Sequence, residues 1–183
     1  MSPILGIWAS QNYPRITNSY ESIATQTVGA GGASSVTFSS IPSTYKHLQV
    51  RSISLASSSQ LSIRAQFNGD TGANYAWHTL YGDGAGAYSN YNGTSANFIG
   101  SFARGGTSGS TFGASVVDIL DYQNTSKNKT TRSLSGVDAN GSGLIWLSSG
   151  LWQSTAAISS IVLYPESGTL LQYSSFALYG VKG

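Results

Sequence analysis

The sequence contains no cysteine and few charged side chains. The absence of cysteine excludes a disulfide framework, a thiolate metal site and a cysteine nucleophile. Nine Lys and Arg against seven Asp and Glu give a net charge of +2, and the basic residues form no cluster of the kind that binds nucleic acid. With only two His and two Glu, the chain is poor in the side chains from which enzyme sites are built.

A long hydrophobic run is also missing. The longest apolar stretch, residues 4–9, is far shorter than the roughly 20 residues that span a bilayer. It carries neither the basic flank nor the cleavage site of a signal peptide. We therefore expect no membrane insertion and no classical export signal, so that the protein is made in a cytoplasm.

In place of charge the chain has 22 Gly, 33 Ser, 15 Thr and 10 Asn. Ser, Thr and Asn hydrogen-bond to their own backbone and favour turns and strands over helices. Hydrophobic residues still make up 40%, which argues against disorder. The composition favours one stable β domain with a polar, uncharged surface.

Alternation of apolar and polar residues supports this fold class. The clearest case is residues 61–67, where Leu61, Ile63, Ala65 and Phe67 share one face and Ser62, Arg64 and Gln66 the other. About ten strands follow one another between turn-forming residues, which favours a two-sheet antiparallel β-sandwich, specifically a jelly roll. The expected strands are 22–28, 35–38, 45–55, 61–67, 75–81, 96–103, 114–122, 130–137, 144–147, 158–164 and 170–181.

Two irregular features are expected within this pattern. In residues 45–55 the apolar positions shift from Leu48 and Val50 to Ile53 and Leu55, which predicts a β-bulge near Arg51. Residues 82–95 (GDGAGAYSNYNGTS) and 104–111 (RGGTSGST) are rich in small and polar residues and are expected to be loops.

Residues 1–20 differ from the rest of the chain, because two prolines interrupt any regular period. They contain an apolar cluster, Ile4, Leu5, Ile7 and Trp8, that needs a covering surface. Either the cluster packs against its own domain, or residues 1–20 are an attachment arm that docks on another subunit. The second interpretation divides the chain into an arm, 1–20, and a sandwich domain, 21–183.

No set of residues predicts catalysis, a metal or a cofactor. His47 and His78 are single histidines on expected strands, and Asp118 and Asp121 point to opposite faces of an extended strand. Residues 82–86 (GDGAG) lack the helix that a phosphate cradle needs, and residues 138–143 (DANGSG) lack the closing glutamate of a calcium loop.

Aromatic residues gather in one central region of the chain. Exposed Tyr and Trp on a surface of low charge are typical of protein or glycan recognition. Core packing is the alternative interpretation, above all for Tyr75 and Trp77. The candidate recognition residues are Trp77, Tyr81, Tyr88 and Tyr91.

Several stretches resemble a group of small virion proteins of tailed bacteriophages. The resemblance implies a structural virion component with a jelly-roll-like domain and carries no catalytic motif. It covers nearly the whole chain and is carried by SPILGIWASQ, YESIATQTVGAGGASSVTFSSIPSTYKHLQVR, FNGDTG, DILDYQNTSKNKTTRSLSG and QYSSFALYGVKG.

Three hypotheses follow from the residues and the resemblance together. The first is a non-enzymatic protein that decorates or cements a capsid as a homo-oligomer, for instance a trimer, attached through the arm to the major capsid protein. The second is a tail-fibre or tail-tip module that contacts tail subunits and binds a host surface glycan through the aromatic region. The third is a glycan-active enzyme on the same fold.

Overall fold

The structure is a computed structural model that describes residues 19–58, 62–106 and 110–183. These residues form twelve strands and no helix, which confirms the all-β prediction. No helix in these ranges is long and apolar enough to cross a membrane. The strands are β1 (Tyr20–Thr27), β2 (Val36–Phe38), β3 (His47–Ser54), β4 (Ser62–Phe67), β5 (Tyr75–Gly82), β6 (Ala87–Ala96), β7 (Ile99–Arg104), β8 (Gly113–Leu120), β9 (Lys129–Asp138), β10 (Gly143–Trp152), β11 (Ile161–Pro165) and β12 (Ser175–Val181).

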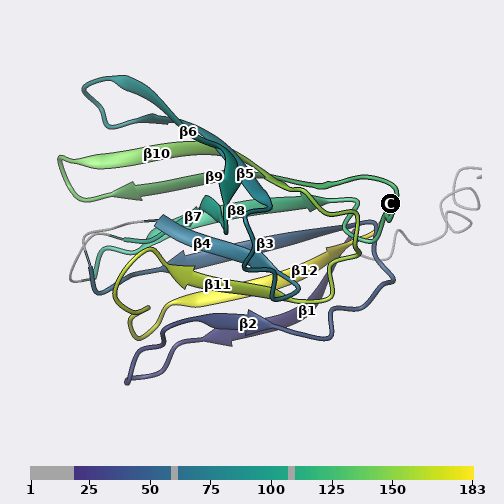
Figure 1. Cartoon of the computed structure of the whole chain (residues 1–183). Helices are drawn as coiled ribbons and strands as arrows, with labels where there is room; N and C mark the ends of the chain where they lie inside the picture. Colours follow the sequence, from purple (N-terminus) through teal and green to yellow (C-terminus); the bar gives the residue numbers. More distant parts are fainter. Residues whose placement is uncertain (1–18, 59–61, 107–109) are drawn as a thin grey trace, which may run out of the picture.

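The strands form two antiparallel sheets packed face to face (Figure 1). The larger sheet has eight strands in the order β1-β12-β3-β8-β9-β10-β5-β6, and the smaller has four in the order β2-β11-β4-β7. The predicted two-sheet sandwich is therefore correct. The smaller sheet covers only part of the larger one, and the β5–β6 and β9–β10 hairpins extend beyond it (Figure 1).

The jelly roll stays a prediction. Along the chain, β1, β3, β8 and β12 lie in the larger sheet, while β2, β4, β7 and β11 lie in the smaller. This crossing of the chain between two sheets is compatible with an eight-stranded jelly roll. On that interpretation, the β5–β6 and β9–β10 hairpins are insertions that widen one sheet.

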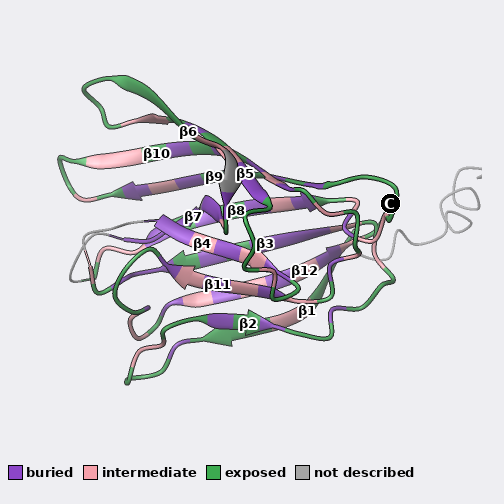
Figure 2. Cartoon of the chain, in the orientation of Figure 1, coloured by how far each residue is buried: buried purple, intermediate pink, exposed green. Residues whose placement is uncertain are grey.

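The core lies between the sheets and draws alternate residues from both. On β4, Ile63, Ala65 and Phe67 are completely buried, as the alternation predicts, and Arg64 and Gln66 on the opposite face are half-buried. Leu61 lies outside the described residues. Leu48, Val50, Val117, Ile119, Phe176 and Leu178 face this cluster from the larger sheet. Figure 2 shows the resulting alternation of buried and exposed residues along the strands.

The predicted bulge near Arg51 is wrong. β3 pairs with β8 and β12 without a shift in register from His47 to Ile53. Leu48, Val50 and Ser52 face the core, whereas Ile53 lies on the opposite face with 56% of its surface exposed. The apparent shift arises because this strand carries apolar residues on both faces.

The predicted loop at 82–95 is also wrong over most of its length. Only Asp83 to Gly86 form the turn, and β6 then pairs with β5, with Tyr88 opposite Tyr81 and Tyr91 opposite His78. Asp83 Oδ1 closes the turn by accepting hydrogen bonds of 2.9 Å from the backbone N–H groups of Ala85 and Gly86. Similarly, Arg104 is the last residue of β7 and not the start of a loop.

Candidate functional site

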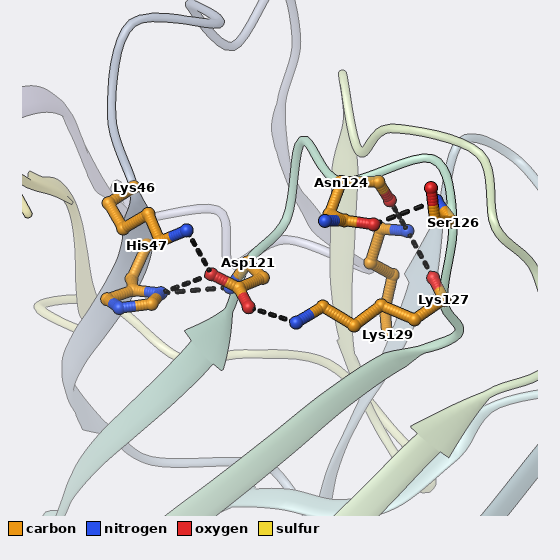
Figure 3. A network of polar contacts seen from close by, with 7 residues as sticks. All are labelled: Lys46, His47, Asp121, Asn124, Ser126, Lys127 and Lys129. Carbon is orange, nitrogen blue, oxygen red and sulfur yellow. Dashed lines mark hydrogen bonds and ion pairs between the residues drawn. The ribbon is translucent and has the colours of Figure 1, made fainter.

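His47 and Asp121 lie together beside the connection between β8 and β9, in a network with a structural role (Figure 3). The backbone N–H of Asp121 donates a hydrogen bond of 2.9 Å to His47 Nδ1, which leaves that nitrogen unavailable as a base. The carboxylate of Asp121 pairs with Lys46 at 3.1 Å and with Lys127. The φ of Asp121 is +47°, a left-handed conformation in which a short polar residue is favoured. The network therefore holds the connection in its turn.

The side chain of Lys129 also binds the connection between β8 and β9 (Figure 3). This residue is completely buried, and its Nζ donates to the carbonyl oxygens of Asn124, Lys127 and Thr155 at 2.6, 3.0 and 3.0 Å. All three N–H groups of the ammonium are thus used by the backbone. Burial lowers the pKa of Lys129, and the nearby charge of Lys127 adds to this effect.

The Asp121 network predicts a loss of stability in acid. Hydrogen bonds from Lys127, and then from Lys46, lower the pKa of Asp121 from its ordinary value of 3.8 to about 2. Because the folded pKa is depressed, the stabilisation is present above pH ~4 and is lost as the pH falls through about 2. Urea midpoints of the wild type and Asp121→Asn should differ at pH 7 and converge as the pH falls through about 2. A difference that stays constant over this range would show that the carboxylate charge is not what stabilises the turn.

The other candidate catalytic and metal residues are also structural. Asp118 lies on the outer face of β8, where it accepts from Gln49 at 2.8 Å and from Arg132 at 3.0 Å. Residues 138–143 form the β9–β10 turn, closed by a 2.7 Å bond from Ala139 N–H to the Ser142 carbonyl oxygen. Within the described ranges, no three His, Cys, Asp or Glu residues stand close enough to hold a metal ion.

The outer face of the larger sheet carries large apolar side chains in adjacent cross-strand positions. Val116, Leu134, Leu147 and Leu80 form one row across β8, β9, β10 and β5. Ile53 and Ile145 stand at the two ends of the next row, separated by Ala114 and Gly136. We call the six large side chains the outer apolar face; they are 43–62% exposed: Ile53, Leu80, Val116, Leu134, Ile145 and Leu147.

The outer apolar face gathers exposed apolar side chains on one surface. Each of the six is 43–62% exposed, and contiguous apolar patches larger than a few hundred Å² are rare on monomeric proteins. Between them lies a shallow hollow of ≈ 510 Å³ above the small residues Ala114 and Gly136. Beside it, Arg51 lies between the rings of Tyr20 and Tyr179, at 5.1 and 4.9 Å from their centroids.

The four candidate recognition residues fall on two different faces. Tyr91 is 68% exposed on the outer face, where it stacks on His78 at 5.6 Å. Trp77, Tyr81 and Tyr88 lie on the inner face, where the larger sheet extends past the smaller one. Trp77 is half-buried, because the backbone of Gly100 packs directly on its indole: a Cβ at Gly100 would lie 2.5 Å from the ring. Tyr75 belongs to the core, as the alternative interpretation predicts.

A stack of four side chains forms on this inner face. Tyr88 stacks on Tyr81 at 5.1 Å, and Tyr81 stacks on Trp146 at 4.0 Å with only 7° between the rings. The guanidinium of Arg104 lies 4.0 Å from the centroid of the Trp146 ring. Since Tyr81 and Arg104 approach Trp146 equally closely, they must occupy opposite faces of the indole. Four strands thus contribute one group each.

The stack borders a cleft of ≈ 450 Å³ between the edge of the smaller sheet and the inner face of β5, β6 and β10. This volume is within the range of about 300–1,000 Å³ of small-molecule sites. Arg64 and Glu166 form an ion pair of 2.8 Å at the cleft, with the Arg64 guanidinium 4.0 Å from the ring of Phe98. The lining residues are Ser62, Arg64, Trp77, Asn90, Asn92, Phe98, Gly100, Arg104, Trp146 and Glu166.

Arg104 and Trp146 are two residues of this cleft that the sequence did not single out. Arg104 stands beside two glycines and Trp146 among apolar residues of a strand, so neither carries a motif. Of the four predicted recognition residues, Trp77 lines the cleft, whereas Tyr81 and Tyr88 belong to the adjoining stack.

No protein-family model, curated protein or solved structure matches this chain. The predicted arm residues Ile4, Leu5, Ile7 and Trp8 lie outside the described residues. The two surfaces that carry functional hypotheses are therefore the outer apolar face and the inner cleft.

Proposed function

We propose that this protein is a non-enzymatic structural subunit of a bacteriophage virion that decorates or cements the capsid as a homo-oligomer. The observation that carries the proposal is the outer apolar face, because exposed apolar patches of this kind mark protein–protein contacts. The sequence resemblance to small virion proteins of tailed phages supports the same class. The terminal cluster Ile4, Leu5, Ile7 and Trp8 is proposed as the arm that attaches each subunit to the particle.

The occupant proposed for the outer apolar face is a second copy of this chain. A second copy packed on this face would cover all six exposed side chains at once, and an interface of standard size takes ~800 Å² from each partner. Among the charged residues at its border, Asp118 and Arg132 neutralise each other, and the Arg51 guanidinium contacts the rings of Tyr20 and Tyr179. A surface with few charges has little long-range field, so shape and apolar contact decide the partner.

The test introduces a negative charge at one of two positions on β9, in two separate variants. Leu134 and Thr130 are both exposed on the outer face of β9, but only Leu134 belongs to the outer apolar face. Leu134→Glu should convert the wild-type oligomer into a monomer that still unfolds cooperatively, measured by sedimentation equilibrium and thermal unfolding. Thr130→Glu is the matched control and should remain oligomeric.

The same variants are then followed into particles. Hundreds of wild-type copies per virion support the capsid, whereas a few to a few dozen support the tail. A chain that lacks residues 1–19 should remain folded and fail to enter particles if the arm is the anchor. A monomeric wild type, or an oligomer that survives Leu134→Glu, would contradict the proposed use of the outer apolar face.

A second candidate function is a tail-fibre or tail-tip module that binds a host surface glycan. The observation that favours it is the inner cleft, where Trp77, Phe98 and Trp146 contribute aromatic surface and Asn90 and Asn92 supply amide groups. Sugars bind such combinations because their C–H faces pack on rings while their hydroxyls hydrogen-bond.

Binding is favoured over hydrolysis for this cleft. Glycosidases of the common type place two carboxyl groups on either side of the scissile bond. The described lining includes one carboxylate, Glu166, and Arg64 pairs with it at 2.8 Å. The third hypothesis, a glycan-active enzyme, would need turnover of a glycan by the purified protein.

A further inference from the structure

We infer that the inner cleft binds an acidic saccharide, with the guanidinium of Arg104 as the group that receives its carboxylate. The inference rests on the second proposed function, glycan binding, and deepens it by naming the class of sugar. It depends on three observations. Arg104 has no carboxylate partner among the described residues, buried N–H groups of the lining residues have no acceptor there, and the carboxylate of Glu166 is paired with Arg64.

Arg104 is a buried cation without a counter-ion. Only 8% of its surface is exposed, and no carboxylate of the described residues lies within 4.0 Å of it. Its pKa is lowered to about 10 because burial disfavours the charged form. The cation–π contact with Trp146 offsets part of the cost of burying this charge, and an anion in the cleft would offset more.

Hydrogen-bond donors around the cleft are also unused. Arg104 Nε, Trp77 Nε1 and Trp146 Nε1 are buried and have no acceptor within the part of the chain that the structure describes. A buried donor without an acceptor costs about 1–3 kcal/mol, and such groups call for a specific explanation. All three belong to residues that line one cleft. A ligand rich in oxygen atoms is the chemistry that matches this excess of donors.

The charge balance of the cleft selects an acid over a neutral sugar. Its two arginines face one carboxylate, Glu166, which is engaged by Arg64. The lining therefore has one positive charge in excess, at Arg104. A planar guanidinium binds a carboxylate through two parallel hydrogen bonds, which a neutral hydroxyl does not reproduce.

The experiment compares acidic sugars with their neutral methyl esters. The probes are trigalacturonate and 3′-sialyllactose, each with its methyl ester, titrated calorimetrically into the full-length protein. At least one acidic probe should bind tenfold or more tightly than its neutral partner, and the preference should weaken with added salt. Arg104→Met should lose the preference, whereas Arg132→Met, which removes an arginine from the opposite face, should keep it.

The possible results test three statements separately: that the cleft binds a glycan, that the glycan is acidic, and that Arg104 binds its carboxylate. If none of the four probes binds at millimolar concentration, both glycan binding and the acidic class are overturned. If acidic and neutral partners bind equally, glycan binding stands and the acidic class is overturned. If a folded Arg104→Met keeps the preference for acid, the assignment to Arg104 is wrong. The wild-type comparison remains decisive even if Arg104→Met does not fold.

Discussion

Ile63→Ala is expected to lower the free energy of unfolding by about 2–5 kcal/mol, the range for large-to-small substitutions in a close-packed core. Ile63 is completely buried between the two sheets, and the smaller residue leaves a cavity that its neighbours fill only in part. For a chain of this length, each kcal/mol lowers the melting temperature by roughly 2–4 °C. Urea and thermal unfolding of the purified variant measure the effect.

Ile53→Ala is the matched control, because it makes the same chemical change on the exposed outer face. Ile53 is 56% exposed, so the substitution should change stability by less than about 1 kcal/mol when measured on dilute, monomeric protein. Equal losses at the two positions would mean that the outer face is covered by part of the chain itself. That result would also remove the basis for self-association.

The contrast between these two isoleucines shows what the sequence could and could not predict. Ile63 sits in a strand whose apolar residues occupy one face, so the period of two alone places it in the core. Ile53 sits in a strand with apolar residues on both faces. If one face of the strand is assumed to be polar, the shift of the apolar residues to the other face predicts a bulge, although the register is unbroken.

Most of β6 was predicted to be a loop, because this strand has large aliphatic residues on neither face. It is the last strand of the larger sheet and extends past the smaller one, so neither of its faces needs large aliphatic residues. Its sequence, AYSNYNGTSA, therefore lacks the apolar alternation that marks a half-buried strand. Its pairing with β5 depends on contacts such as Tyr81 on Tyr88, which are visible only once the two strands are aligned.

The inner cleft depends on register between segments that are distant in the chain. Arg104, Trp146 and Tyr81 come from β7, β10 and β5, and they stack only because the two sheets overlap at this position. Arg104 follows an apolar strand and precedes two glycines, which locally favours a loop. Its burial on an indole is a tertiary effect, and composition and periodicity carry no information about it.

Lys129→Ala is expected to cost about 3–5 kcal/mol, because each buried carbonyl oxygen left without a donor costs about 1–3 kcal/mol. The substitution takes a completely buried ammonium away from three carbonyl oxygens, those of Asn124, Lys127 and Thr155. Each carbonyl that stays buried without a donor is destabilising, and the missing side-chain stem leaves a cavity. Lys129→Met, which keeps the stem and loses only the donors, should recover part of the loss.

Lys127→Ala is the matched control two residues earlier in the same connection. The Lys127 side chain is 56% exposed, and its ion pair with Asp121 is of the surface type that contributes about 0–1 kcal/mol. Urea unfolding of the three variants at pH 7 separates the buried lysine from the exposed one. If Lys129→Ala cost no more than Lys127→Ala, the three hydrogen bonds of Lys129 would not hold the connection. Thr155 follows β10 in the chain. The same result would therefore also mean that Lys129 does not hold the β8–β9 connection against the segment after β10.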